Sequence, residues 1–92
     1  MGEVLPSAVM IGDSVLYQEL EDEVVLLNMA NQQYYGLNDV GAQMWKTLME
    51  IPSVTAALDR LTELYEVDPD VLDADLHRLV RELLEAGLLK TA

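Results

Sequence analysis

The spacing of hydrophobic residues changes once along this chain, after Leu37, and this change constrains the fold more than any other feature. Before it, short runs rich in β-branched residues alternate with polar turns, which is the pattern of strands. The predicted strands are 14–20, 24–29 and 33–37. The stretches 21–23 and 30–32 predict turns, and Asn31 is a residue that tolerates the left-handed backbone conformation. Strands joined by such short connections predict an antiparallel meander.

From residue 38 onward, apolar residues recur at helical spacing and predict three helices. Asn38 and Ser53 are expected to cap the first two helices, because their side chains can accept a hydrogen bond from the first turn. Asp68 followed by Pro69 predicts the start of the third helix, and Gly87 predicts its end. The expected fold class is therefore α+β and winged helix-turn-helix-like: a three-stranded antiparallel sheet followed by three helices, βββααα.

Ninety-two residues are enough for one domain and too few for two. Pro6 and Gly12 favour a flexible N-terminal arm over residues 1–13, ahead of a single domain at 14–90. The first ten residues lack the basic and apolar regions of a signal peptide, and no apolar run approaches the roughly 20 residues that span a bilayer. The chain has no cysteine, which agrees with the cytoplasmic location that we expect.

The charge of the chain is strongly acidic, with 17 acidic residues against five basic ones and a formal net charge of −12. Nucleic-acid binding depends on placing Lys and Arg against phosphates, so a winged-helix DNA-binding protein is a disfavoured alternative even though the third helix carries Arg78 and Arg81. Anionic membranes are disfavoured for the same reason. A neutral or basic partner is favoured, although an acidic surface can also serve solubility alone.

The sequence offers little for catalysis. His77 is the only histidine, there is no cysteine nucleophile, and no glycine-rich phosphate loop is present. The acidic run that begins at Asp68 lacks the glycine and the final glutamate of a calcium-binding loop, so it is better explained as a cap and first helical turn rich in acids. We therefore expect no enzyme activity, no cofactor and no metal site.

The strand 33–37 carries neither the charge nor the proline that usually protect an exposed sheet edge. Tyr34 and Tyr35 place large amphipathic side chains on its opposite faces. Two interpretations stay open at this point. The edge can accept an extended peptide as an added strand; alternatively, the tyrosines complete the core and the N-terminal arm covers the edge.

Three stretches resemble the PqqD family. The first is EVVLLNMANQQYYGLNDVGAQMWKTL at 23–48, in which YYGLN followed by GAQMW is the most specific part. VDPDV at 67–71 and ELLEAGLL at 82–89 continue the match, so that the resemblance covers roughly residues 14–90. Gln32 departs from the family, which often has glycine in this hairpin turn.

The resemblance implies a recognition element for ribosomally made, post-translationally modified peptides, on which a precursor's leader peptide docks as a fourth strand against the third helix. The strand residues of the implied site are Gln33, Tyr34, Tyr35, Gly36 and Leu37. Helical periodicity predicts the facing wall, which consists of Asp75, Leu76, Leu79, Glu82 and Leu83. Arg78 is expected at the rim, where it can pair with a leader carboxylate.

The partners implied are the precursor leader peptide and a maturation enzyme. We favour the recognition protein of a lasso-peptide pathway, which delivers the precursor to a leader peptidase. The alternative is a PqqD-type chaperone that presents a precursor to a radical enzyme in pyrroloquinoline quinone synthesis. A structural role, in which the exposed strand pairs with a second copy of the chain, is a further alternative.

Overall fold

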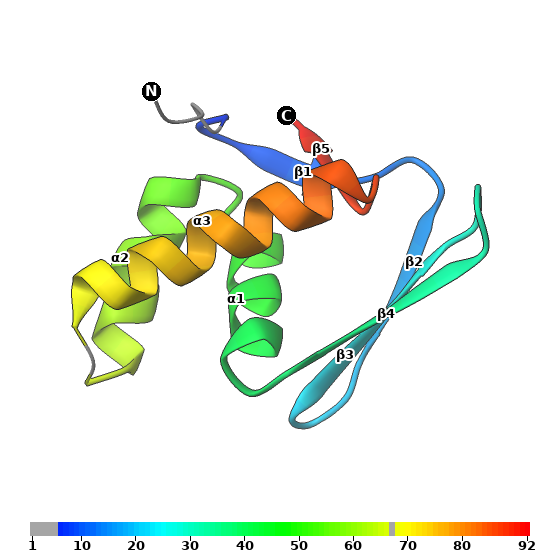
Figure 1. The fold of residues 1–92 in the computed structure, drawn as a ribbon. Helices are drawn as coiled ribbons and strands as arrows, with labels where there is room; N and C mark the ends of the chain where they lie inside the picture. The colour runs from blue at the N-terminus through cyan, green and yellow to red at the C-terminus, as the bar shows by residue number, and fades with distance from the viewer. Residues whose placement is uncertain (1–5, 67) are drawn as a thin grey trace.

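The computed structural model describes residues 6–66 and 68–92, and it confirms the predicted order of a three-stranded antiparallel sheet followed by three helices (Figure 1). Each predicted strand and helix is present, with ends that differ by one or two residues. The elements are β1 (Val9–Ile11), β2 (Val15–Glu19), β3 (Glu23–Asn28), β4 (Gln33–Asn38), α1 (Asp39–Glu50), α2 (Val54–Leu64), α3 (Pro69–Glu85) and β5 (Leu89–Thr91).

A second, two-stranded sheet joins the two ends of the described chain, and the sequence did not predict it. β1 pairs antiparallel with β5, with Met10 opposite Lys90 (Figure 1). Val9 is fully buried, and its amide donates to the carbonyl of Pro52 at 3.1 Å. The sequence predicted a flexible arm over residues 1–13, whereas in the structure Val9–Ile11 of this arm form the strand β1. Residues 1–5 of that arm lie outside the described residues.

The larger sheet runs in the order β2-β3-β4, and its two faces have different surroundings. Val24, Leu26 and Asn28 of β3 are buried, whereas the residues between them are half-buried, so that one face of the sheet packs on the helices. Register pairs Leu26 with Tyr35 and Val24 with Leu37. Tyr35 and Leu37 therefore belong to the helix-facing side, and Tyr34 belongs to the outer side.

Three of the four predicted helix signals act as expected. The Ser53 hydroxyl accepts from the Ala56 amide at 3.3 Å, and the Asp68 carboxylate accepts from the Asp70 amide at 2.9 Å. Gly87 follows α3 with a φ of +75°. Asn38 occupies the N-cap position of α1, but its side chain makes no capping hydrogen bond, and the next residue has a φ of 49°.

The β3–β4 turn lies where the sequence predicts it, between Asn28 and Gln33. Gln32, not Asn31, takes the left-handed conformation, with a φ of 58°. Asn31 instead uses its side-chain oxygen to accept the amide of Gln33 at 3.1 Å. A turn that needs a left-handed residue at position 32 explains why glycine suits this position in similar sequences.

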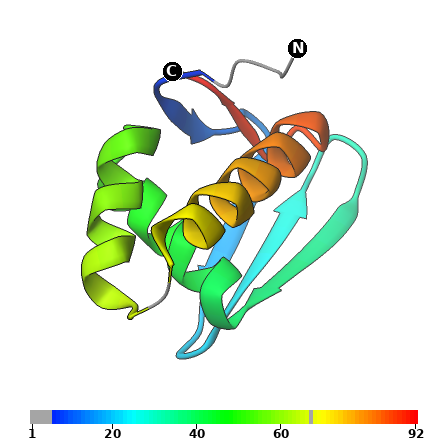
Figure 2. The same cartoon turned by 60° about the vertical axis from the view of Figure 1, so that its left-hand side comes forward.

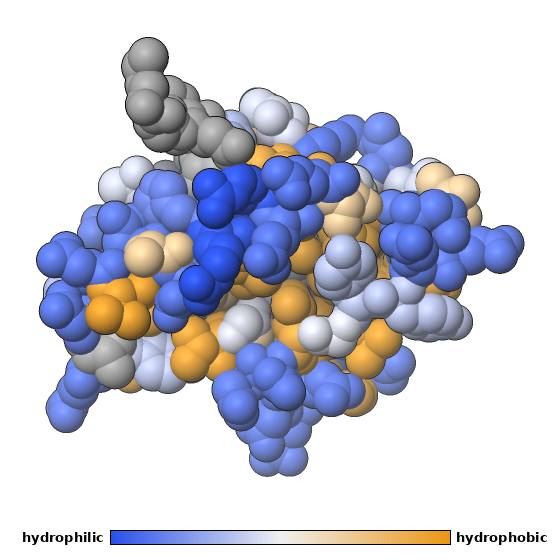
Figure 3. Space-filling model, viewed as in Figure 1, coloured by the Kyte–Doolittle hydropathy of each residue, from blue (hydrophilic) through white to orange (hydrophobic). Residues whose placement is uncertain are grey.

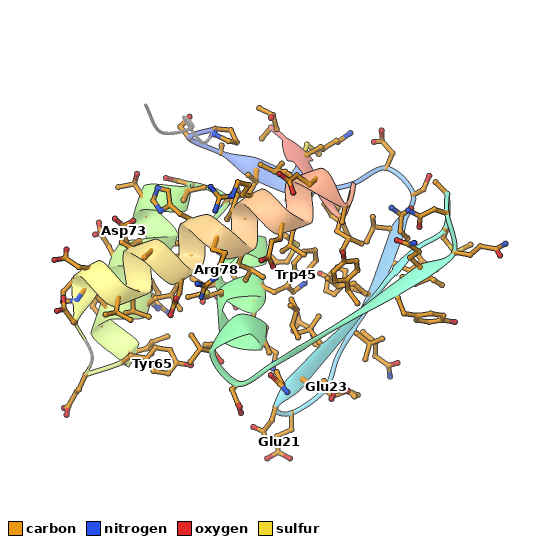
Figure 4. The ribbon with its side chains drawn as sticks, viewed as in Figure 1. Glu21, Glu23, Trp45, Tyr65, Asp73 and Arg78 are labelled. Atoms are coloured by element: carbon orange, nitrogen blue, oxygen red, sulfur yellow. The ribbon has the colours of Figure 1, made fainter. Side chains whose placement is uncertain are left out.

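Trp45 occupies the centre of the core, where α1 faces the sheet (Figure 4). It is fully buried and meets the ring of Tyr17 edge to face, with 5.3 Å between ring centroids. α3 contributes Leu72, Leu76, Val80 and Leu83 to the same core. None of the described helices is both long and apolar enough to span a membrane.

Candidate functional site

The outer edge of β4 has no partner strand among residues 6–66 and 68–92. β4 is the last strand of its sheet, and β1 pairs with β5 at a different place. The described part of the N-terminal arm therefore does not cover this edge, contrary to one of the two interpretations. Tyr34 is 72% exposed and Tyr35 is 38% exposed, so that neither ring completes the core.

The hydrogen-bond pattern identifies which amides point outward from this edge. Antiparallel pairs alternate between hydrogen-bonded and non-hydrogen-bonded positions. The amide of Asp39 donates to the carbonyl of Asp22 at 3.3 Å, so that these two opposite residues form a hydrogen-bonded pair. Counting back along β4 from Asp39, every second residue is therefore hydrogen-bonded to β3. Tyr35 and Leu37 thus pair with β3, whereas Tyr34 and Gly36 direct their backbone groups to the unpaired edge.

A cavity of about 200 Å³ lies between α1 and α3, at the Leu37 end of β4. A Cβ on Gly41, one of its lining residues, would lie 3.8 Å from the Leu37 side chain. The cavity combines an apolar floor with a polar rim. Its lining residues are Val40, Gly41, Met44, Asp75, Arg78, Leu79 and Glu82.

A second cavity, of about 380 Å³, lies at the other end of β4, between the β3–β4 turn and the end of α3. It is lined by Asn31, Gln33, Tyr35, Glu82, Glu85 and Ala86. Because Glu82 lines both cavities, they adjoin along α3. We call the two cavities together with the outer edge of β4 the β4–α3 groove. In the space-filling view, hydrophobic surface lies between α3 and the sheet, bordered by hydrophilic residues (Figure 3).

The structure brings together only part of the predicted helical wall. Asp75, Leu79 and Glu82 line the first cavity of the groove, and their contact with a peptide stays a prediction. Leu76 and Leu83 line neither cavity, because their side chains are buried in the core at 0% and 1% exposure. Periodicity identified the apolar stripe of α3 but not the edge of that stripe that faces the groove.

Several groove residues were not predicted. α1 supplies Val40, Gly41 and Met44, and the second cavity adds Asn31, Glu85 and Ala86. The sequence did carry one signal for Glu85, since it lies three residues after Glu82 and therefore on the same helical face. The α1 residues had no such signal, because the position of α1 relative to α3 follows from tertiary packing.

Arg78 lies on the groove side of α3 (Figure 4) and lines the first cavity, as a rim residue would. Its Nη2 donates to the Asp75 carboxylate at 2.7 Å. The Arg78 side chain is 62% exposed, so the pair is solvated and contributes little to stability. In the free protein, the guanidinium is engaged by Asp75 and not held ready for another carboxylate.

Asn28 connects the sheet to the end of α3 and thereby sets one end of the groove. It is 7% exposed, and its Nδ2 donates to the carbonyl of Ala86 at 3.0 Å. Its Oδ1 accepts the amide of Ala30 at 3.0 Å, which also holds the start of the β3–β4 turn. At the opposite end of the sheet, Lys46 of α1 donates to the carbonyls of Leu20 and Glu21 at 2.9 and 3.2 Å.

The one histidine lies outside the groove. Nδ1 of His77 is 2.8 Å from both the carbonyl and the carboxylate of Asp73, one turn earlier on α3 (Figure 4). Across the part of the chain that the structure describes, no group of three metal-ligating side chains comes together. The groove thus offers backbone hydrogen bonds, apolar surface and carboxylates.

Figure 2 shows α3 crossing in front of the larger sheet. This fold and groove define a class of protein: a small α+β, winged-helix-like domain with an unpaired strand edge and cavities beside it along a helix. The chain belongs to the PqqD family. The model of that family, described as coenzyme PQQ synthesis protein D, matches residues 23–89 and so includes β3, β4 and all three helices.

Two solved structures resemble the whole domain. One is described as TbiB1 in complex with the TbiA(beta) leader peptide; it is 33% identical, with a TM-score of 0.82 over 89% of this chain and 95% of that one. The other is a lasso peptide synthetase B1 complexed with the leader peptide; it is 25% identical, with a TM-score of 0.79 over 90% of this chain and 98% of that one. No curated protein sequence matches the chain.

Proposed function

We propose that this chain binds the leader segment of a ribosomally made precursor peptide, which adds to β4 as a fourth strand of the larger sheet. The observation that carries the proposal is the unpaired edge of β4, a strand whose residues Gln33 and Tyr35 line one of the two cavities. Backbone hydrogen bonds to the edge would fix the register of the peptide, and the cavities would receive alternate side chains.

The two solved relatives support a leader as the class of peptide. Both are described as complexes with leader peptides, and each shares nearly the full length of this chain. A leader is disordered before it binds, so that ordering it opposes binding, and a moderate affinity is expected for the area buried.

Binding alone does not mature a peptide, so the bound leader must be presented to an enzyme. The description of one relative as a lasso peptide synthetase B1 favours delivery to a lasso-peptide leader peptidase. The family model, named for PQQ synthesis, supports a radical enzyme as the alternative. In either pathway, holding the leader raises the effective concentration of the core segment at the enzyme. Incubating a precursor with this chain and with each enzyme in turn distinguishes the two pathways, because the chain should raise the reaction rate of the cognate enzyme only.

The chain contributes recognition and not chemistry. The polar side chains of the groove are carboxylates, amides, one tyrosine and the Asp75-bound Arg78. No nucleophile with an adjacent base is among them. A precursor incubated with this chain alone should show no mass change, and a modified or cleaved product would contradict this part of the proposal. A cytoplasmic site of action stays a prediction from the sequence.

The proposal is tested by fluorescence polarisation with labelled candidate leader peptides, each against a scrambled version of the same peptide. We expect a Kd below about 10 µM, or about −7 kcal/mol, for the leader alone. DNA binding would instead appear as affinity for a duplex that falls steeply with salt. Equal binding of leader and scramble by the folded protein would contradict sequence-specific recognition.

A further inference from the structure

The two ends of the β4–α3 groove differ in charge. At the Leu37 end, the Asp75 carboxylate is paired with Arg78, and Val40, Met44 and Leu79 supply apolar surface. At the Gln33 end, Glu82 and Glu85 line the cavity, and no cation within the described residues pairs with either. Glu82 also lines the Leu37 end, so that this end is mostly apolar with one unpaired carboxylate, whereas the Gln33 end has two carboxylates and little apolar surface.

The end of α3 supplies no cation that would offset the two glutamates. The C-terminus of a helix carries a partial negative charge from its unsatisfied carbonyls, which a Lys or Arg in the last turn usually offsets. α3 has 17 residues and no basic residue in its last turn. Ala86, which follows this turn, lines the same cavity. Several of the last carbonyls already accept hydrogen bonds, among them that of Ala86 from Asn28, so the two glutamates carry the negative potential of this cavity.

We infer that the groove selects peptides with a Lys or Arg two or four residues from an apolar residue; this inference rests on the proposed strand addition. Side chains of an added strand alternate between the two faces of the sheet. A residue opposite Leu37 would face the apolar cavity, and residues opposite Tyr35 and Gln33 would face Glu82 and Glu85. The spacing of two or four residues is the separation of these positions along β4.

The net charge of −12 favours the same partner, since it attracts a basic peptide before contact. The local argument is more specific than the net charge, because it places the basic residue on the helix-facing side of the added strand. A peptide with the same composition but with its basic residue shifted by one position would direct that charge to the outer face, away from α3.

The probe for the test is a library of random twelve-residue peptides displayed on phage and selected against the immobilised full chain. Glu82→Gln/Glu85→Gln removes both charges, and Glu82→Lys/Glu85→Lys reverses them. Glu50→Gln/Glu63→Gln is the matched control, because it changes the net charge equally at exposed positions outside the groove. Gly36→Pro, which removes an outward amide of β4, identifies the peptides that depend on the strand edge.

The wild-type chain and the control should enrich peptides with Lys or Arg two or four residues from an apolar residue. The Gln variant should lose this basic preference but keep the apolar one, and the Lys variant should select Asp or Glu at the same spacing. A resynthesised basic peptide should bind the Gln variant roughly two- to fivefold more weakly for each carboxylate removed. Two outcomes would overturn the basic preference and leave strand addition intact. In the first, peptides that need the β4 edge show no preference for Lys or Arg; in the second, the Gln variant keeps the same preference as the wild-type chain. If Gly36→Pro abolished the binding of none of the selected peptides, strand addition would be overturned as well.

Discussion

Tyr35 of β4 and Glu82 of α3 line the same cavity, although they lie far apart in the sequence and on different elements. Their proximity depends on Asn28, which joins β3 to the end of α3 through the carbonyl of Ala86. The groove therefore has one end held by a part-buried hydrogen bond, beside a strand edge without a partner strand in the described chain. Such a preformed site reduces the entropic cost of ordering a bound peptide.

Gly36→Pro should weaken leader binding by at least about tenfold, because it removes one outward amide and places a ring at the pairing edge. Gly36→Ala is the matched control: a Cβ at this position has no neighbour within 4 Å, and the amide is retained. Polarisation with the labelled leader measures both variants. Equal affinities for the folded Pro and Ala variants would contradict pairing at this edge. If the Pro variant does not fold, Tyr34→Pro with Tyr34→Ala replaces the pair.

Leu79→Ala should weaken leader binding about five- to tenfold, since this half-buried side chain supplies apolar surface to the first cavity. The same change should lower the free energy of unfolding by only about 1 kcal/mol, less than for a fully buried leucine. Leu64→Ala is the control on α2, where the side chain is 53% exposed. A loss of leader affinity that is equal in both variants would show that the cavity plays no specific part.

Asn28→Ala should lower the free energy of unfolding by about 1–3 kcal/mol, because it leaves the Ala86 carbonyl and the Ala30 amide without their side-chain partner. Asn28→Asp keeps an acceptor for Ala30 but loses the donor to Ala86, so that it separates the two bonds. Urea unfolding, followed by Trp45 fluorescence, measures the free energy of unfolding of both variants. Unchanged stability in the Asp variant would mean that the link to α3 is dispensable.

Gln32→Gly should stabilise the protein by about 0.5–1 kcal/mol, because glycine adopts a φ of 58° without the steric cost that glutamine incurs. Asn31→Gly should have the opposite effect, since it removes the side-chain acceptor for the Gln33 amide. Thermal unfolding of the two variants compares them directly. If Asn31→Gly stabilised the protein and Gln32→Gly had no effect, the steric strain of the turn would lie at Asn31 and not at Gln32.

The sequence predicted those features that depend on local signals. Ser53, Asp68 and Gly87 act within one turn of their own position, so that their residue types were sufficient to locate the helix ends. β1 and β5 were missed because each has three residues and its partner strand lies at the other end of the chain. In the β3–β4 turn, Asn31 was favoured by residue preference, but its side chain serves the turn in another way.

The candidate site shows the same division between local and tertiary information. The strand residues of the groove follow from the local motif, and they lie at the unpaired edge. The helical wall was predicted from periodicity, which cannot distinguish Leu76 and Leu83, directed into the core, from Leu79 at its margin. Met44 and Val40 enter the groove only because α1 packs against β3 and β4, which brings it beside α3 at the first cavity.

The central claim is that the leader pairs with the outer edge of β4, and amide hydrogen exchange measured by NMR tests it most directly. In the free protein, Tyr35 and Leu37 should already be protected by β3, whereas Tyr34 and Gly36 should exchange quickly. Addition of the leader should slow exchange at Tyr34 and Gly36 and leave their neighbours little changed. Leader binding that leaves both of these amides unprotected would contradict the account and would place the peptide elsewhere on the domain.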